Sequence, residues 1–270
     1  MRILLSNDDG VRARGIVLLA NLLAGLGHEM TVVAPDRERS AAGHSITTST
    51  LYLDEKSFPG YDARARTFEC SGTPADCAAL GVGIAAPDAE LVLAGINRGP
   101  NLGCDVFYSG TVAAAREGYF EGRPAIALSL AVNRGVQEGE EHYGAALHAV
   151  QVLLENLDAL FGPPGGPSGE RGKRTAALLN VNIPNMPLPE VKGFKVTFAG
   201  RRRYQDRVQR LQMLGRTAYR LMGAAADQEE AEGSDVRAVN EGFIALTFLQ
   251  HDTTDYTLNS TAGMGVLPWP

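Results

Sequence analysis

The sequence predicts an α/β protein built on a doubly wound, mostly parallel sheet. Short apolar runs alternate with longer segments of helical periodicity along the N-terminal half. Polar loops that contain glycine follow several of the apolar runs, as they do in open parallel sheets. The chain of 270 residues is 44% hydrophobic and 21% charged, which is ordinary for one large domain or for one domain with a smaller extension.

The apolar runs are of strand length. They predict strands at residues 3–5, 30–34, 46–53, 66–70, 90–94, 125–130, 176–182 and 242–250. Pro35 and Pro184 end two of these strands, because proline cannot donate to a strand ladder. Strands that alternate with helices form parallel βαβ units with right-handed crossovers.

Apolar side chains at helical spacing predict helices at residues 15–27, 74–84, 110–119 and 143–157. In the first helix four leucines share one face, and Gly27 supplies a C-terminal stop. Thr73 caps the second helix, with Pro74 at its first position. In the last helix apolar residues from Tyr143 to Leu157 recur on one stripe, which we expect to face the core.

The character of the chain changes in its last third. We expect residues 1–190 to form the catalytic core and residues 191–270 to form a C-terminal segment. Residues 162–173, rich in glycine and proline, are typical of a surface loop. Residues 201–220 contain seven arginines, and an acidic stretch follows at 227–235. The arginines fit a solvated face answered by the acidic stretch, a nucleic-acid patch, or an extended arm in oligomer contacts.

The composition narrows the class of protein. Lys plus Arg is 25 and Asp plus Glu is 31, so the net charge of −6 disfavours a nucleic-acid partner. Three cysteines without a CxxC motif disfavour both a disulfide framework and a four-thiolate zinc site. The N-terminal apolar run is short for a signal peptide, and no stretch approaches the about 20 apolar residues of a membrane span. We expect a cytoplasmic enzyme with no membrane partner.

Two adjacent carboxylates, Asp8 and Asp9, directly follow the first expected strand in the sequence SNDDG. Open parallel sheets bind ligands at the carboxyl ends of their strands, and carboxylates there suit Mg²⁺ or Mn²⁺. Asp-Asp-Gly is also ordinary turn chemistry, so a purely structural turn is an alternative. A dinucleotide site is disfavoured, since GxGxxG is missing and the carboxylates repel a pyrophosphate.

A second polar loop follows the strand at 30–34. Hydroxyl and charged side chains are dense there, and Ser40, His44 and Ser45 are placed to face the crevice. An ordinary polar surface loop is the alternative interpretation.

A third loop follows the strand at 90–94 and runs into the helix at 110–119. Asn97 can ligate a hard cation through its amide oxygen. The helix N-terminus presents free N–H groups and the positive end of the dipole, which favours an anion, although Ser109 or Thr111 also fits a plain N-cap. We expect the phosphate of a substrate to contact Asn101, Ser109, Gly110 and Thr111.

A parallel sheet brings these three segments to one crevice. Two carboxylates, a serine, an asparagine and a helix end together predict a site for a metal ion and a phosphate. Other motifs are missing, since the chain has no GxxxxGK[ST], HExxH or GxSxG.

The sequence resembles the survival protein SurE family of metal-dependent nucleotidases. The resemblance is carried by residues 3–10 with SNDDG, 34–47 (APDRERSAAGHSIT), 71–77 (SGTPADC), 95–118 (GINRGPNLGCDVFYSGTVAAAREG), 180–184 (NVNIP) and 200–208 (GRRRYQDRV). Residues 212–236 match only weakly.

The resemblance implies a Rossmann-like domain that dephosphorylates nucleoside 5′-monophosphates and 3′-monophosphates. It implies one divalent metal per subunit, Mg²⁺ or Mn²⁺, held by Asp8, Asp9, Ser40 and Asn97. It also implies a homodimer or homotetramer that uses C-terminal segments, which favours the arm interpretation of the arginine-rich stretch. Activity on short polyphosphate is a further implication.

For the mechanism we expect Asp8 or Asp9 to orient an attacking water or to take its proton, while the helix start stabilises the equatorial phosphate oxygens. A covalent aspartyl-phosphate is the rival pathway. A haloacid-dehalogenase-type phosphatase needs Asp-x-Asp after the first strand, which this chain lacks. A non-enzymatic nucleotide or polyphosphate sensor stays an alternative, and turnover distinguishes it from an enzyme.

Overall fold

A computed structural model describes residues 1–133, 135–137, 139–164, 174–202, 204–205, 208–221, 224–225 and 231–254. Most of the expected loop at 162–173 and part of the acidic stretch at 227–235 lie outside the described residues, as do Arg203 and Arg207. Across the described ranges, no helix combines the length and the apolar character that crossing a membrane requires.

Nine strands form one central sheet in the order β3-β4-β2-β1-β5-β6-β7-β13-β8. They are β1 (Arg2–Ser6), β2 (Glu29–Pro35), β3 (Leu53–Glu55), β4 (Arg66–Cys70), β5 (Leu91–Arg98), β6 (Ala125–Ala131), β7 (Leu178–Pro184), β8 (Phe194–Val196) and β13 (Ile244–Leu249). The strands from β4 to β7 run parallel, whereas β3 and β13 pair antiparallel with β4 and β7. The predicted α/β fold with a mostly parallel sheet is confirmed.

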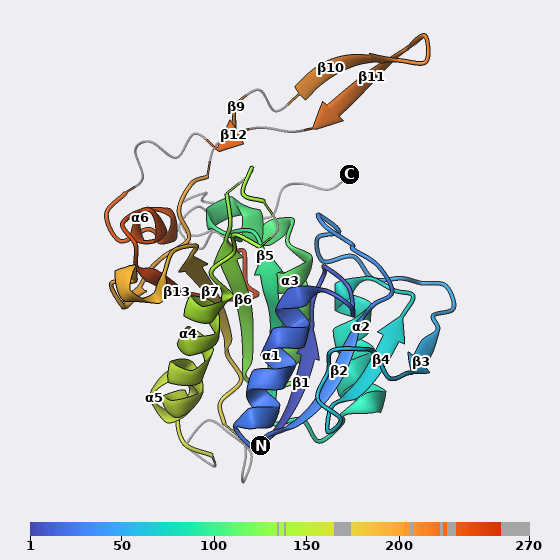
Figure 1. Cartoon of the computed structure of the whole chain (residues 1–270), viewed down its shortest axis with the longest axis vertical. Helices are drawn as coiled ribbons and strands as arrows, with labels where there is room; N and C mark the ends of the chain where they lie inside the picture. The colour runs from blue at the N-terminus through green and yellow to red at the C-terminus, as the bar shows by residue number, and fades with distance from the viewer. Residues whose placement is uncertain are drawn as a thin grey trace, which may run out of the picture.

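Helices cover both faces of the sheet (Figure 1). One face carries α1 (Arg14–Gly25), α4 (Tyr143–Glu155) and α5 (Leu157–Phe161), and the other carries α2 (Pro74–Leu80) and α3 (Gly110–Phe120). Side chains of a strand alternate between the two faces. Ile3 and Leu5 of β1 therefore pack in the core under α1 and α4, while Leu4 packs in the core under α2 and α3. Each fully buried leucine stabilises the fold by about 2 kcal/mol.

Three expected elements differ in detail. The strand expected at 46–53 is observed only at Leu53–Glu55, because Ile46 and Tyr52 are exposed and have no sheet face to cover. The long apolar stripe is divided at Asn156 into α4 and α5, and Leu157 still reaches the core. The helix expected at 74–84 passes from α2 into a single π-helical turn, η1 (Gly81–Ala85).

The C-terminal part divides between the sheet and a projecting hairpin. β8, β13 and the short helix α6 (Asp235–Asn240) pack with the central layers, so the sheet extends past residue 190. β10 (Val208–Met213) and β11 (Arg216–Leu221) form an antiparallel hairpin that extends away from those layers, joined to them through the short pair β9 (Tyr204–Gln205) and β12 (Ala224–Ala225) (Figure 1). Most of the arginine-rich stretch therefore lies on this hairpin.

Candidate active site

The strand order reverses at β1, whose neighbours are β2 and β5, and Asp8 and Asp9 lie in the turn that follows β1. Asn7 closes this turn. Its Nδ2 donates to the Gly10 carbonyl oxygen at 2.9 Å, and its Oδ1 accepts from the Gly10 N–H at 3.2 Å. Gly10 has a φ of +101°, which residues with side chains rarely adopt. Asn7 and Gly10 thus hold the turn, and neither aspartate is needed to form it.

Asp8 is buried against the start of α3. Thr111 Oγ1 donates to Asp8 Oδ1 at 2.5 Å, and the Thr111 side chain is itself fully buried. Burial raises the pKa of Asp8, while hydrogen bonds from the hydroxyl and the backbone of Thr111 oppose that rise. The N-terminus of α3 therefore already faces a carboxylate, the kind of group that a helix start attracts.

Asp9 follows Asp8 in the turn after β1 and contacts the end of β5. The backbone N–H of Arg98 donates to Asp9 Oδ2 at 3.2 Å. Burial, and then the negative charge of Asp8, raise the pKa of Asp9 to about 7. The charge of Arg98 and the hydrogen bond from its backbone oppose this rise without cancelling it. The buried carboxylate of Asp8 and the half-buried one of Asp9 therefore lie close enough for the charge of each to disfavour the other.

Gly110 allows α3 to begin in contact with Asp8. A Cβ placed on Gly110 would lie 2.8 Å from Asp8 Cβ and 2.8 Å from Pro74 Cγ. Ser109 is the N-cap, and its hydroxyl accepts from the Val112 N–H at 3.0 Å. The N-cap interpretation of Ser109 is thus confirmed. The same hydroxyl keeps its own proton to donate to a ligand.

The loop after β2 reaches Asp8 through its backbone. The Arg39 N–H donates to the Asp8 carbonyl oxygen at 2.7 Å. Ser40 is exposed, and its hydroxyl donates to Glu38 Oε1 at 2.6 Å. The Glu38 charge raises the pKa of both Asp8 and Asp9, which places this third carboxylate beside the pair. His44 instead pairs with Glu117 of α3.

Asn97 lies within β5, not in a loop, because β5 runs four residues beyond its expected end. The pairing of β5 with β6 shifts register between Ala94 and Asn97. The Asn97 Nδ2 donates to the Gly99 carbonyl oxygen at 2.9 Å. Its Oδ1, the atom that can ligate a cation, is thereby left for the crevice.

Asn101 is buried and fixes its loop to the sheet. Its Nδ2 donates to Ser129 Oγ at 2.8 Å, and its backbone N–H donates to Asn182 Oδ1 at 2.8 Å. Its carbonyl oxygen accepts from Asn180 Nδ2 at 2.8 Å and from Asn182 Nδ2 at 3.0 Å. In this structure the side-chain amide of Asn101 therefore donates to Ser129 of β6. Its predicted contact with phosphate stays a prediction.

The donor set fits a hard divalent cation. Mg²⁺ is usually bound by one or two carboxylates, with water and substrate oxygens completing its shell. Asp8 and Asp9 supply two carboxylates, Ser40 adds a neutral oxygen from the loop after β2, and Asn97 adds one from the end of β5. No cluster of three His, Cys, Asp or Glu side chains suited to a metal occurs among the described residues. A cation here would therefore depend on the paired aspartates.

Glu38, Arg98 and Glu141, which the sequence analysis did not single out, also belong to this region. Glu38 lies two positions before Ser40. Glu141 is buried and accepts from Arg98 Nε at 2.6 Å and from the Gly139 N–H at 2.8 Å. A cavity of about 400 Å³ lies between Asp9 and this pair. The sequence shows that Glu38 lies near Ser40. It does not show the contact between Arg98 and Glu141, because these two residues are 43 positions apart.

Comparisons with known proteins agree on one family. The family model described as survival protein SurE matches residues 3–206. A 5′-nucleotidase SurE from Synechococcus elongatus is 43% identical over 264 residues, which cover 95% of this chain and 96% of that protein. One from Stenotrophomonas maltophilia is 40% identical over 258 residues, covering 95% and 92%. The crystal structure of a SurE protein from Aquifex aeolicus superposes with a TM-score of 0.75 at 37% identity, covering 97% of this chain and 98% of that one.

Proposed function

The chain belongs to the survival protein SurE family, and from this we propose that it is a 5′-nucleotidase, a hydrolase that converts nucleoside 5′-monophosphates to nucleosides and phosphate. The observation that supports this most strongly is the contact between Asp8 and the start of α3. Asp8 lies against the backbone and hydroxyl donors of this helix start, and Asp9 is its neighbour in the chain. A phosphomonoester needs both the carboxylates and the donors, because its oxygens are stabilised by cations and by oriented donors.

We assign the divalent cation to Asp8, Asp9, Ser40 and Asn97, with one Mg²⁺ or Mn²⁺ per subunit. When bound, the cation supplies Lewis-acid stabilisation of charge on the phosphate oxygens. Ser40 must then turn from Glu38, which now accepts its hydroxyl proton. The chain's own contribution is to hold two carboxylates together at a burial that would otherwise disfavour their charge.

The phosphate contacts are assigned to the start of α3. Ser109 has a hydroxyl proton to donate, and the backbone N–H groups of Gly110 and Thr111 belong to the first turn, where no helical acceptor exists. Asn101 is a further predicted contact that requires its amide to leave Ser129. These donors are fixed before substrate arrives, so they lose little free energy in reorganising.

Asp8 and Asp9 are the proposed catalytic residues. The Asp8 carboxylate accepts a hydrogen bond from the buried hydroxyl of Thr111. The Asp9 carboxylate accepts a longer one from the backbone N–H of Arg98. Asp9 therefore has the less engaged carboxylate, and we assign to it the orientation of the attacking water and the uptake of its proton. Direct attack by water needs no covalent intermediate on Asp8, which the aspartyl-phosphate route would require.

The proposal extends to other substrates, to assembly and to location. Hydrolysis of 3′-monophosphates and of short polyphosphate needs only the same phosphate and cation contacts. A homodimer or homotetramer formed through residues 191–270 accounts for the exposed apolar side chains of the β10–β11 hairpin. A cytoplasmic location accords with three cysteines that are all free thiols. No nucleic-acid or membrane partner is proposed.

The test measures phosphate release from 5′-AMP, 3′-AMP and tripolyphosphate, with each nucleotide's binding measured in parallel. We expect turnover of 5′-AMP in the presence of Mn²⁺ or Mg²⁺. Saturable binding of 5′-AMP without phosphate release under any metal condition would contradict an enzyme and would support the sensor alternative. The 3′-AMP and tripolyphosphate arms decide the two additional activities separately.

A further inference from the structure

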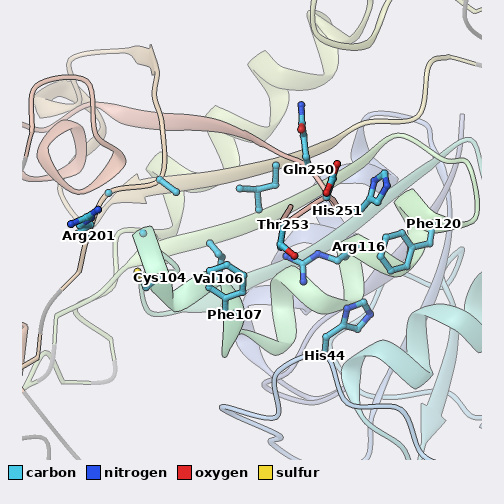
Figure 2. Close-up of a pocket in the computed structure, with 15 residues that line it drawn as sticks. His44, Cys104, Val106, Phe107, Arg116, Phe120, Arg201, Gln250, His251 and Thr253 are labelled. Carbon is cyan, nitrogen blue, oxygen red and sulfur yellow. The ribbon is translucent and has the colours of Figure 1, made fainter. Parts of the chain in front are cut away.

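A second cavity, which shares no lining residue with the Glu141 cavity, lies along α3 (Figure 2). Its volume is about 490 Å³. It is within the size range of small-molecule sites. Its lining includes His44, Phe107, Arg116, Phe120 and His251, which come from the loop after β2, from the segment before α3, from α3 itself and from the end of β13.

The same two loops that supply the proposed cation and phosphate contacts also line this cavity. Phe107 precedes the N-cap Ser109 by two residues, and His44 follows Ser40 by four. The two loops are joined where the Gly43 N–H donates to the Tyr108 carbonyl oxygen at 3.0 Å. A molecule held at the start of α3 therefore has this cavity as its neighbour.

The helix itself connects the two places. Ser109 and Arg116 are seven positions apart, so they lie on the same face of α3 at a separation of about 10 Å along the axis. The ribose and base of a nucleotide span a comparable distance. A nucleotide whose phosphate contacts the helix start can thus place its base against Arg116.

The cavity wall is aromatic. The ring of His44 stacks on Phe120 with centroids 5.7 Å apart, and Phe120 meets the ring of His251 edge-on at 6.4 Å. The Phe107 side chain is 60% exposed, although it lies at the cavity and not on a flat surface (Figure 2). Such rings offer flat faces on which a planar base can stack.

Arg116 contributes a buried polar atom to the cavity. Its Nε is buried without a hydrogen bond, and no carboxylate lies within ion-pair distance of its guanidinium among the described residues. Burial lowers the pKa of Arg116, with the charge of Glu117 opposing. A buried donor atom without an acceptor is costly, so an acceptor that a ligand brings to the Nε of this half-buried side chain is favoured.

We propose that this cavity binds the base of the nucleotide substrate and that Arg116 selects bases with two acceptors on one edge. The inference rests on the proposed nucleotidase function and specifies its substrate. A guanidinium only donates, and guanine and hypoxanthine present O6 and N7 together as acceptors. Adenine presents a donor in place of O6, which a guanidinium cannot satisfy. The enzyme is therefore selective for 6-oxopurine nucleotides.

The test compares kcat/KM for GMP, AMP and ribose 5-phosphate, which has no base. We expect the wild-type enzyme to favour GMP over AMP by about tenfold, the discrimination that a good bidentate pair gives. Arg116→Met should remove that preference through a higher KM for GMP. Its Tm should stay close to that of the wild type, because the buried Nε of Arg116 has no hydrogen bond to lose among the described residues. Arg64→Met, which removes an exposed guanidinium that pairs with Asp62 outside the cavity, is the matched control.

A second measurement needs no variant. Guanosine should inhibit wild-type hydrolysis of ribose 5-phosphate at a lower concentration than adenosine does. Equal use of GMP, AMP and ribose 5-phosphate by the wild type, or an unchanged GMP preference in Arg116→Met, would overturn the base pocket while leaving the nucleotidase intact. Failure to hydrolyse all three, ribose 5-phosphate included, would instead be a failure of the proposed function.

Discussion

Gly110 allows the start of α3 to lie against Asp8, because glycine has no side chain. Asp8 and the first turn of α3 approach so closely that a Cβ on Gly110 would lie 2.8 Å from Asp8 Cβ. The close approach lets Thr111 donate to the Asp8 carboxylate. Any side chain at this position must move the helix start, Asp8, or both.

Gly110→Ala should therefore reduce kcat/KM for a nucleoside 5′-monophosphate by about 100-fold, the loss expected when reacting groups shift by about 1 Å. Steady-state kinetics of phosphate release measure this. Gly144→Ala is the matched control, since a Cβ there meets nothing within 4 Å inside α4. That control should keep full activity and gain about 0.5 to 1 kcal/mol of stability. An active Gly110→Ala enzyme would contradict the placement of the phosphate at α3.

The end of β5 connects the turn after β1 to the segment before α4. Arg98 donates its backbone N–H to Asp9, and its guanidinium donates to the buried Glu141. The Glu141 carboxylate also accepts from the Gly139 N–H, so it joins β5 to the segment before α4. The hydrogen bond from Arg98 and the backbone donors hold the pKa of Glu141 at about 2.

Glu141→Gln should lower the free energy of unfolding by about 2 kcal/mol at pH 7, because Arg98 loses a charged partner. A depressed pKa gives stability that is complete above the ordinary pKa of 4.5 and is lost as the pH falls toward about 2. The difference in the free energy of unfolding between the variant and the wild type should therefore shrink as the pH falls from 4.5 to about 2. Urea unfolding from pH 2 to pH 7 measures it, with Glu140→Gln, a neighbouring exposed carboxylate, as the control. A difference that does not depend on pH would refute the charge argument.

The elements also mark what sequence reasoning can reach. Most strands and helices up to β7, the strand β13 and the adjacent pair Asp8–Asp9 were predictable, because apolar periodicity and the position after β1 are local properties. The strand β8, the helix α6 and the β10–β11 hairpin were not predicted. The extension of β5 to Arg98 could not be predicted, because Gly95 and Asn97 are residue types typical of loops. They stay in the strand through a shift in the register between β5 and β6, which the sequence does not show. The Glu141 contact depends on how the segment before α4 folds back, which no local pattern specifies.

At the scale of the molecule, the arginine-rich stretch lies mainly on a hairpin that the central layers do not cover (Figure 1). Leu214 at its tip is 100% exposed, and Val208, Met213 and Tyr219 are exposed as well. An isolated two-stranded hairpin is marginally stable alone in water. Exposed apolar side chains on such an arm favour the oligomer interpretation over a merely solvated face.

Replacing Leu214 and Tyr219 by aspartate should lower the molecular mass measured by light scattering in solution, because two charges enter an apolar contact. Leu214 has a φ of +49°, a conformation that aspartate tolerates, so the turn should survive. Gln209→Asp with Gln212→Asp adds the same charge at exposed polar positions of the hairpin and should leave the mass unchanged. An unchanged mass in the first variant would show that residues 191–270 associate by another surface or that the chain is monomeric.

The central claim is that Asp8 and Asp9 hold a cation beside the donors at the start of α3 and so hydrolyse a phosphomonoester. The most direct measurement is phosphate release from AMP, GMP, CMP and UMP by the wild type and by Asp9→Asn, each with Mn²⁺, with Mg²⁺ and with EDTA. Calorimetry of Mn²⁺ binding and circular dichroism accompany it. We expect metal-dependent turnover by the wild type that EDTA abolishes, and a folded Asp9→Asn protein that neither binds Mn²⁺ nor releases phosphate. Full activity in EDTA, or a metal-loaded and active Asp9→Asn enzyme, would contradict the account.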